Sequence, residues 1–170
     1  MPVLISDRRI QPDDAWLMIA DEAPIPQEGP VVLGWDRWIL EQETLRGRSD
    51  PLGIRVNGDV PIQELGPQAE RFDLIALEFP VATDGRCYSH ARVLRTQYRF
   101  RGELRAVGNV LRDQIAFMER VGINSFLLDQ GRSYAEQALA ALGEISVAYQ
   151  TAPLDTLPRI RRRLAGAEPA

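Results

Sequence analysis

Short apolar runs alternate with longer amphipathic stretches from residue 52 onward, and this alternation restricts the chain to an α/β fold. The apolar runs lie at 52–56, 73–79, 103–108, 124–128 and 146–150 and predict five β-strands. The stretches between them, at 60–71, 87–99, 109–121 and 133–145, have helical spacing, although Gly66 and Pro67 divide the first into two short turns. Strands that alternate with helices form a mainly parallel sheet with right-handed crossovers.

The sequence leaves two ways of closing this sheet. A simple sequential strand order would curl into a partial (β/α) barrel, and a reversal of the order would give a doubly wound open sheet. The short connections between predicted elements favour the partial barrel. A partial barrel leaves open sheet edges, which the N-terminal segment or a second copy in a homodimer must cover.

Residues 1–50 are expected to extend the βα repeats of residues 51–150 within a single domain, 1–150. Residues 3–10 predict an edge strand or the start of a hairpin, and 13–22 a short acidic helix. A proline-rich loop at 24–30 precedes a strand at 31–33 and a helix that begins near Trp35. Residues 151–170 are expected to form a tail with a short basic helix.

Composition narrows the classes of protein to consider. Of the 170 residues, 45% are apolar, as in soluble globular proteins, and no run approaches the roughly 20 apolar residues that span a membrane. A single cysteine, Cys87, excludes an internal disulfide and a multi-cysteine metal site. The N-terminus lacks the pattern of a signal peptide. We therefore expect a cytoplasmic protein without a metal or other cofactor.

All 20 basic residues are arginine, and they concentrate in the middle of the chain. Residues 84–132 hold nine arginines and five acidic residues, whereas residues 1–83 hold seven arginines and fifteen acidic residues. Guanidinium groups pair well with carboxylate, phosphate and sulfur oxyanions. This distribution predicts a small anionic ligand or an acidic protein partner. The net charge of −4 argues against nucleic acid.

Polar residues gather where the predicted strands end, beginning with Glu78. Ligands of parallel α/β proteins lie beyond the carboxyl ends of the strands, so these residues form the predicted site. Asp84 and Asp113 are the candidates for acid–base catalysis. The candidate ligand-binding residues are Arg86, Tyr88, Ser89, Arg105, Asn109, Arg112 and Gln114.

Two helix N-termini would make this site an anion site, since backbone N–H groups and the helix dipole favour negative charge. Ser89 lies in the first turn of one helix, which begins at Cys87, and Asn109 begins the other. In the alternative interpretation, Asp84–Arg86 and Arg112–Asp113 are structural ion pairs that link the loops. Gln114 would either brace the turn at Gly108–Asn109 or face a ligand, because a polar group on an apolar helix face needs a partner.

Cys87 and His90 have both structural and catalytic interpretations. Cys87 is expected to be a buried apolar residue, since it shares a helix face with Ala91 and Leu94; the alternative is a reactive thiol of low pKa beside Arg86. His90 is expected on the helix surface, and the alternative is a general base.

Three segments carry a resemblance to a known family: DGRCYSHARVLR, GELRAVGNVLRDQ and RVGINSF. They resemble a bacterial domain family of unknown function, to which an oxidoreductase activity is sometimes attributed. Genes of that family usually lie beside those of assimilatory sulfite reductase and the adenylyl-sulfate reductases. The similarity spans roughly residues 30–150. Cys87 stands where the family has glycine or alanine, and Val121 stands where it has cysteine, which argues against a thiol mechanism.

Three functions follow as expectations. The resemblance implies an accessory protein of sulfate assimilation, which binds an oxyanion or docks on sulfite reductase or an acidic electron carrier through its arginines. The residues alone permit a small-molecule enzyme, such as an oxidoreductase, in which Asp84 or Asp113 is the acid or base and Arg105 and Arg112 hold a substrate anion. The third expectation is a structural adaptor without a site.

Overall fold

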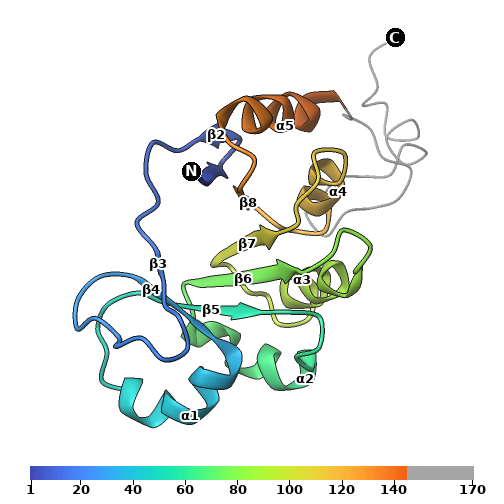
Figure 1. Ribbon diagram of the computed structural model, residues 1–170. Coiled ribbons are helices and arrows are strands. Elements are labelled where there is room, and N and C mark those ends of the chain that lie inside the picture. Colours follow the sequence, from blue (N-terminus) through green and yellow to red (C-terminus); the bar gives the residue numbers. More distant parts are fainter. Residues whose placement is uncertain (145–170) are drawn as a thin grey trace.

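The computed structural model describes residues 1–144, which form an eight-stranded curled sheet with helices on its outer side (Figure 1). The elements are β1 (Val3–Ser6), β2 (Arg9–Ile10), β3 (Leu17–Met18), β4 (Val31–Gly34), α1 (Trp35–Leu45), β5 (Leu52–Val56), α2 (Ile62–Leu65), the 3₁₀ helix η1 (Gly66–Arg71), β6 (Leu74–Phe79), α3 (Arg86–Thr96), β7 (Glu103–Gly108), α4 (Ile115–Arg120), β8 (Ser125–Leu128) and α5 (Arg132–Glu144).

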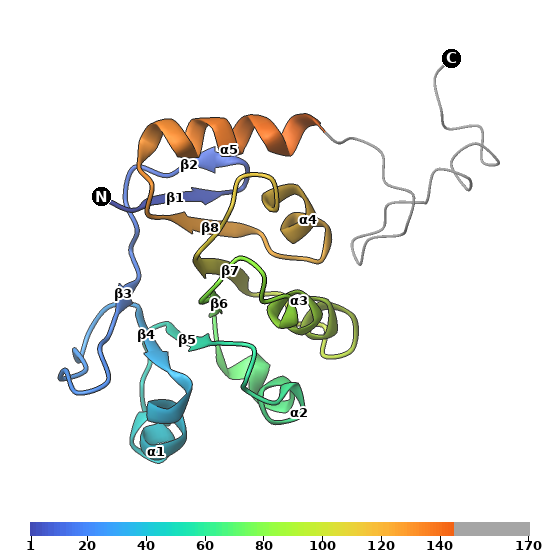
Figure 2. The ribbon, with the colours of Figure 1, turned by 45° about the vertical axis from the view of Figure 1, so that its right-hand side comes forward.

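The strand order is β2-β1-β8-β7-β6-β5-β4-β3, so consecutive strands from β3 to β8 are neighbours. These six strands are parallel. Figure 2 shows the strands as an arc with the helices around its convex side. The partial barrel is therefore confirmed, and the doubly wound alternative is wrong because the order never reverses between β3 and β8.

The N-terminal segment contributes strands at both ends of the sheet. β1 and β2 form a hairpin whose turn residues, Asp7 and Arg8, have φ angles of 51° and 57°. Such left-handed turns match the twist of a hairpin. β1 also pairs antiparallel with β8 and so covers the edge that the repeats leave there. At the other end, β3 is the outermost strand and pairs with β4.

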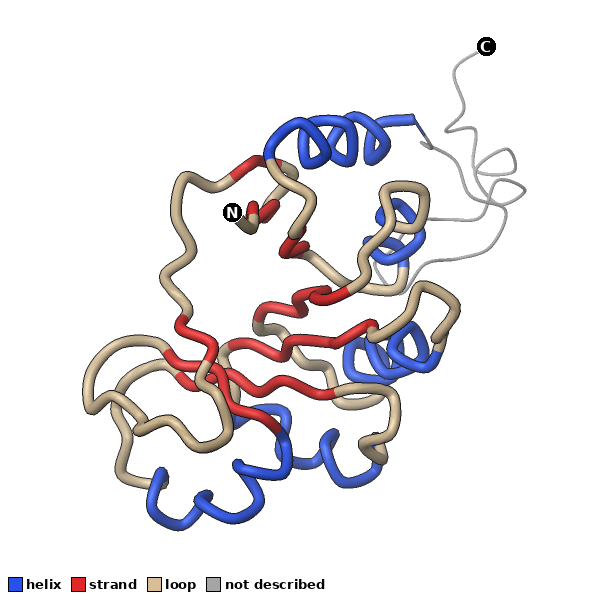
Figure 3. The backbone as a smooth tube through the Cα atoms, viewed as in Figure 1, coloured by secondary structure: helices blue, strands red, loops and turns tan. Residues whose placement is uncertain are grey.

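Residues 11–16, the connector, run between β2 and β3 and thus between the two edges of the sheet (Figure 3). The helix predicted at 13–22 is wrong: the connector is irregular and β3 follows it. Pro12 lacks a backbone donor, and the Asp14 carboxylate accepts the N–H of Trp16 at 3.1 Å. This local side-chain bond competes with helix formation.

The core lies mainly between the sheet and the outer helices, where residues such as Ile54, Leu77 and Leu104 are fully buried. A smaller cluster lies on the concave face and consists of Val32, Leu74, Ala76 and Val107, with Trp16, Met18 and Leu127 packed against it. The strands alternate between the two faces, as their period of two requires. Both faces are therefore apolar in the middle of the sheet, which explains the nearly continuous apolar run of β6.

The remaining predicted elements agree with the structure, with one exception. The predicted helix at 60–71 divides into α2 and η1 at Gly66. The helix predicted at 133–145 is α5, which begins and ends one residue earlier. The first half of the helix predicted at 109–121 is wrong, because α4 begins only at Ile115. The predicted strand 146–150 and the tail 151–170 lie outside the described residues. Within residues 1–144, no helix is long and apolar enough to cross a membrane.

Candidate functional site

A pocket of about 380 Å³ opens at the carboxyl ends of β4, β5 and β6. In parallel α/β sheets and barrels, this end of the strands carries the ligand site. The lining residues come from the ends of these strands, the loops that follow them and the segment after β3. They are Asp21, Gly34, Trp35, Asp36, Arg55, Val56, Asn57, Asp59, Val60, Pro61 and Glu78.

Arg55 and Glu78 reach the pocket from the concave face of the sheet. Their neighbours in β5 and β6, such as Ile54 and Leu77, are fully buried on the opposite face. The Arg55 Nε and Glu78 Oε2 atoms are 3.8 Å apart, and the two side chains are 39% and 37% exposed. The pair is too long for a hydrogen bond, so both groups retain capacity for a ligand.

Arg86 fixes one wall of the pocket by joining two loops. As the first residue of α3, it donates to Asp59 in the loop after β5 and to Asp84 in the loop after β6. The Nη2–Oδ2 distance to Asp84 is 2.7 Å. A Cβ atom on Gly58 would lie only 2.7 Å from the Cβ atom of Arg86. Any residue larger than glycine at position 58 would therefore displace the Arg86 side chain.

Asp84 closes the N-terminus of α3. One carboxylate oxygen accepts both the backbone N–H of Arg86 at 3.1 Å and its Nε–H at 3.0 Å. These bonds lower the pKa of Asp84 to about 2. The Asp84 carboxylate thus already neutralises Arg86 and occupies the N-terminus of α3, where an external anion was expected to bind. The alternative in which Asp84 and Arg86 form a structural pair agrees with this geometry.

The pocket is negatively charged. Four carboxylates line it, from Asp21, Asp36, Asp59 and Glu78, and the one guanidinium in the lining is that of Arg55. Arg86 pairs with Asp59, so three carboxylates remain against Arg55. Over residues 1–144, no three His, Cys, Asp or Glu side chains come together as a metal-binding group. The negative charge is spread along the walls, so one small polar molecule in the pocket can contact several carboxylates.

Tyr88 and Ser89, predicted to bind a ligand, lie in the first turns of α3. Ser89 is exposed, whereas Tyr88 is half-buried between the rings of Phe79 and Phe117, at centroid distances of 5.2 and 5.1 Å. Burial raises the pKa of Tyr88. Tyr88 therefore acts as a packing residue between β6, α3 and α4.

The other predicted residues after β7 occupy a loop and not a helix N-terminus. Asn109 and Asp113 are exposed there. The backbone N–H of Arg112 donates to the Tyr134 hydroxyl at 2.7 Å, and its Nη1 donates to Gln137 at 3.2 Å. Arg112 is thus bound to α5, and the expected anion site at the start of a helix at Asn109 is absent from this loop.

Gln114 braces two loops. Its Nε2 donates to the carbonyl of Ala82 at 3.0 Å, which joins the loop before α4 to the loop before α3. Its Oε1 is buried without a hydrogen-bond partner among the described residues. Gln114 therefore braces the loop at Ala82 and not the turn at Gly108–Asn109 that was expected.

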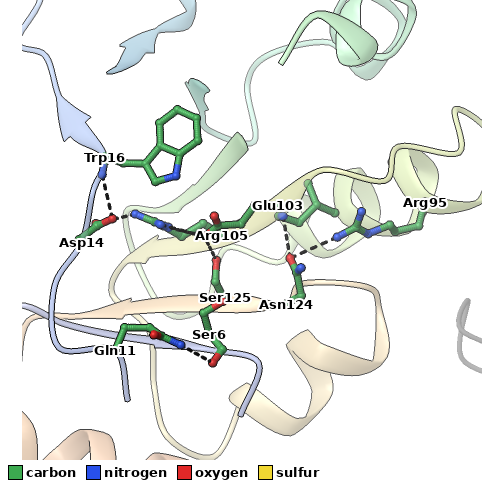
Figure 4. Close-up of polar contacts among 10 residues, drawn as sticks. Ser6, Gln11, Asp14, Trp16, Arg95, Glu103, Arg105, Asn124 and Ser125 are labelled. Atoms are coloured by element: carbon green, nitrogen blue, oxygen red, sulfur yellow. Dashed lines mark hydrogen bonds and ion pairs between the residues drawn. The ribbon is translucent and has the colours of Figure 1, made fainter. Parts of the chain in front are cut away.

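Arg105 lies apart from the other predicted residues, near the start of β7 on the concave face. It is 1% exposed and forms ion pairs with Asp14 of the connector at 2.6 Å and with Glu103 at 2.8 Å. Ser125 donates to the same Glu103 oxygen at 2.5 Å (Figure 4). Glu103 and Arg105 share a face because they are two residues apart in a strand. The structure therefore assigns Arg105 to holding the connector against the sheet.

Cys87 and His90 are both buried on the inner face of α3. Cys87 was predicted to be buried and is 1% exposed, and burial raises the pKa of its thiol to about 12. The alternative of a reactive thiol is therefore wrong. The surface position predicted for His90 is also wrong, since it is 8% exposed and burial lowers its pKa.

Sequence reasoning missed most of the pocket. Asn57 and Asp59 directly follow the strand 52–56, and this position was the available signal. Arg55 was overlooked because the rest of its strand is apolar. Side chains alternate along a strand, so Arg55 lies on the face of the sheet opposite to Ile54 and Val56. Asp21 carries no local signal, because it reaches the pocket through the pairing of β3 with β4.

A model of one protein family matches residues 53–160 of this chain, and its description reads "Bacterial protein of unknown function (DUF934)". No curated protein matches the sequence. The matched region includes the pocket residues contributed by β5 and β6, among them Arg55, Asp59 and Glu78. Asp21 and Asp36 lie before it.

Proposed function

Because the chain belongs to the DUF934 family of bacterial proteins of unknown function, we propose a function from the site itself: binding of a small organic cation, such as an amine, in the pocket at the carboxyl ends of β4, β5 and β6. The observation that carries this proposal is an excess of negative charge around a cavity of about 380 Å³: Asp21, Asp36 and Glu78 face the single Arg55, while Asp59 is paired with Arg86. Carboxylates form charge-assisted hydrogen bonds with ammonium groups.

The size and the charge pattern describe the ligand further. A volume of about 380 Å³ falls in the lower part of the range of small-molecule pockets. Arg55 is half-exposed beside Glu78 and can donate hydrogen bonds to one anionic or carbonyl oxygen. The ligand that fits is compact, with an amino group facing the carboxylates and an oxygen facing Arg55.

The same pocket offers a position for proton transfer. Glu78 is half-exposed, faces the cavity and can accept a proton from a bound molecule. Asp84 is less suited, because a pKa of about 2 makes its carboxylate a weak base with no proton to donate near neutral pH, and Arg86 binds its oxygens. If the protein is an enzyme, we propose Glu78 as its acid–base residue.

Thermal-shift measurements with amines, amino acids, sulfite, sulfate and phosphate test the proposed ligand class. We expect amines or amino acids to raise the melting temperature and the inorganic anions to leave it unchanged. Glu78→Gln and Asp36→Asn should each weaken the best ligand about tenfold, or about 1.4 kcal/mol. Glu136→Gln, an exposed change on α5, is the matched control. Stabilisation by the anions but not by any amine would contradict the proposal.

A second candidate function is docking on an acidic partner, as an accessory protein of sulfate assimilation. Arg92, Arg99 and Arg101 are exposed, and no carboxylate of residues 1–144 lies within ion-pair distance of them. They belong to α3 and to the loop before β7, away from the acidic pocket. The family resemblance suggests sulfite reductase as the partner.

Co-purification with sulfite reductase at low and moderate salt tests this docking. We expect binding at low salt that weakens as salt screens the charges. Changing Arg92, Arg99 and Arg101 together to glutamine should abolish it, whereas the same change at Arg8, Arg46 and Arg132 should not. Equal loss in both triple variants would indicate only a general charge effect and would count against docking at this surface.

A further inference from the structure

A second pocket, of about 330 Å³, lies at the opposite end of the strands, and we propose that it binds the carboxylate of a small organic acid with an apolar body. Its walls include Leu52 at the start of β5 and Asp73 just before β6. Since these strands are parallel, this amino-terminal pocket faces away from the acidic one. The proposal concerns a separate site and goes beyond the proposed function.

The charges of the amino-terminal pocket differ from those of the first. Three arginines and two aspartates line it, but the aspartates are engaged by backbone donors. Asp73 accepts the N–H of Leu52 at 3.1 Å, and Asp50 accepts the N–H of Gly29 at 2.5 Å. Arg48 is engaged as well, since it donates to the carbonyl of Pro26 at 2.6 Å. Arg46 and Arg71 remain as the cations available to a ligand.

Arg71 is the better placed of these two. Its guanidinium carbon lies 6.0 Å from the centre of the Trp38 ring, and no carboxylate among residues 1–144 is within ion-pair distance of it. Arg46 pairs with Glu43 at 3.0 Å, but both side chains are more than 60% exposed. Such a surface pair is weak, so a ligand carboxylate can compete for Arg46.

The apolar part of the pocket is held in place by contacts of Trp38. Trp38 is buried, its indole N–H donates to Gln68 at 3.1 Å, and its ring contacts Phe72 edge to face at 5.1 Å. Leu45 and Leu52 provide further apolar wall. An arginine held over an aromatic ring beside aliphatic side chains matches a molecule with one anionic end and an apolar body.

The surroundings of the pocket oppose a second negative charge on the ligand. α1 ends at Leu45, so the negative end of its dipole lies at this pocket, and Asp50 and Asp73 add negative charge. A phosphate dianion would be repelled more than a carboxylate. This difference separates the proposed ligand class from phosphorylated compounds.

Titration of the full-length protein with benzoate, benzamide, benzylamine and phenyl phosphate tests the proposal, with the indole N–H signal of Trp38 followed by NMR. We expect benzoate to shift this signal and to bind more tightly than phenyl phosphate, with no shift from benzamide or benzylamine. Arg71→Gln should weaken benzoate roughly tenfold, and Arg132→Gln, on α5, should leave it unchanged.

Two results would overturn the assignment. Benzamide that binds as well as benzoate would show that the charge plays no part. Benzoate affinity that is unchanged in Arg71→Gln would place the anion elsewhere. Arg71 is exposed on η1, so its replacement leaves the core intact and the comparison remains valid in a folded protein.

Discussion

His90 is the single histidine of the chain and couples folding to pH through its burial. Its Nδ1 atom is buried and has no hydrogen-bond partner among the described residues. Burial is the main cause that lowers its pKa; Arg86 lowers it further and Asp84 partly offsets these effects. The folded protein therefore keeps His90 neutral at a pH where the unfolded chain would bind a proton.

This difference predicts that stability falls as the pH drops below the ordinary histidine pKa of about 6.5. There the unfolded state binds more protons than the folded state, so the free energy of unfolding decreases with decreasing pH. Urea unfolding at about pH 7.5 and 5.5 measures the effect. In His90→Leu the difference between the two pH values should shrink. An equal difference in parent and variant would assign the pH dependence to other groups.

The connector 11–16 is the element that completes the half-barrel on its concave side. It joins the two edges of the sheet, and Asp14 attaches it to the buried Arg105 of β7. Trp16 packs on the small concave cluster, and its ring would be 3.2 Å from a Cβ atom on Gly53. The connector thus supplies side chains that the missing strands of a complete barrel would otherwise provide.

Asp14→Ala should lower the free energy of unfolding by about 1.5–3 kcal/mol, the usual range for a hydrogen bond to a charged group. The buried guanidinium of Arg105 would retain Glu103 but lose its second carboxylate. Asp13→Ala is the matched control, because Asp13 is exposed beside it and should cost less than about 0.5 kcal/mol. Urea unfolding of both variants measures these changes. An equal decrease in the free energy of unfolding would mean that the Asp14–Arg105 pair does not hold the connector.

The elements also show what local sequence can predict. β5 to β8 were predictable because burial on both faces makes their residues apolar in a recognisable period. The helix predicted at 13–22 failed because Asp14 bonds to Trp16 locally and to Arg105, 91 residues away. The helix predicted at 109–121 failed in its first half, where the Tyr134 hydroxyl of α5 accepts the N–H of Arg112.

The candidate site was less predictable than the strands, because it also depends on contacts between residues far apart in the sequence. The carboxyl ends of the strands were the correct region to search by the general rule for parallel sheets. The charge was predicted from the arginines of the middle segment, yet Arg86 is neutralised by Asp59 and Asp84. Such pairings between loops depend on the order of the strands and leave no signal in the spacing of residues.

At the scale of the whole molecule, the two ends of the sheet differ in charge. The carboxyl ends of β4 to β6 carry the acidic pocket, and the amino ends of β5 and β6 carry the pocket with Arg46 and Arg71. The family match includes the β5 and β6 walls of the acidic pocket, but only Arg71 and Asp73 of the other. We infer that the half-barrel uses both ends of its sheet and that the acidic end holds the principal ligand.

An NMR titration with the amine that stabilises the protein most tests the central claim directly. We predict that backbone amide shifts concentrate in Asn57, Asp59 and Glu78 at the acidic pocket, and that Glu78→Gln weakens the titration about tenfold. Shifts that concentrate instead around Arg46 and Arg71, or that are the same in Glu78→Gln, would contradict the assignment of the acidic pocket as the ligand site.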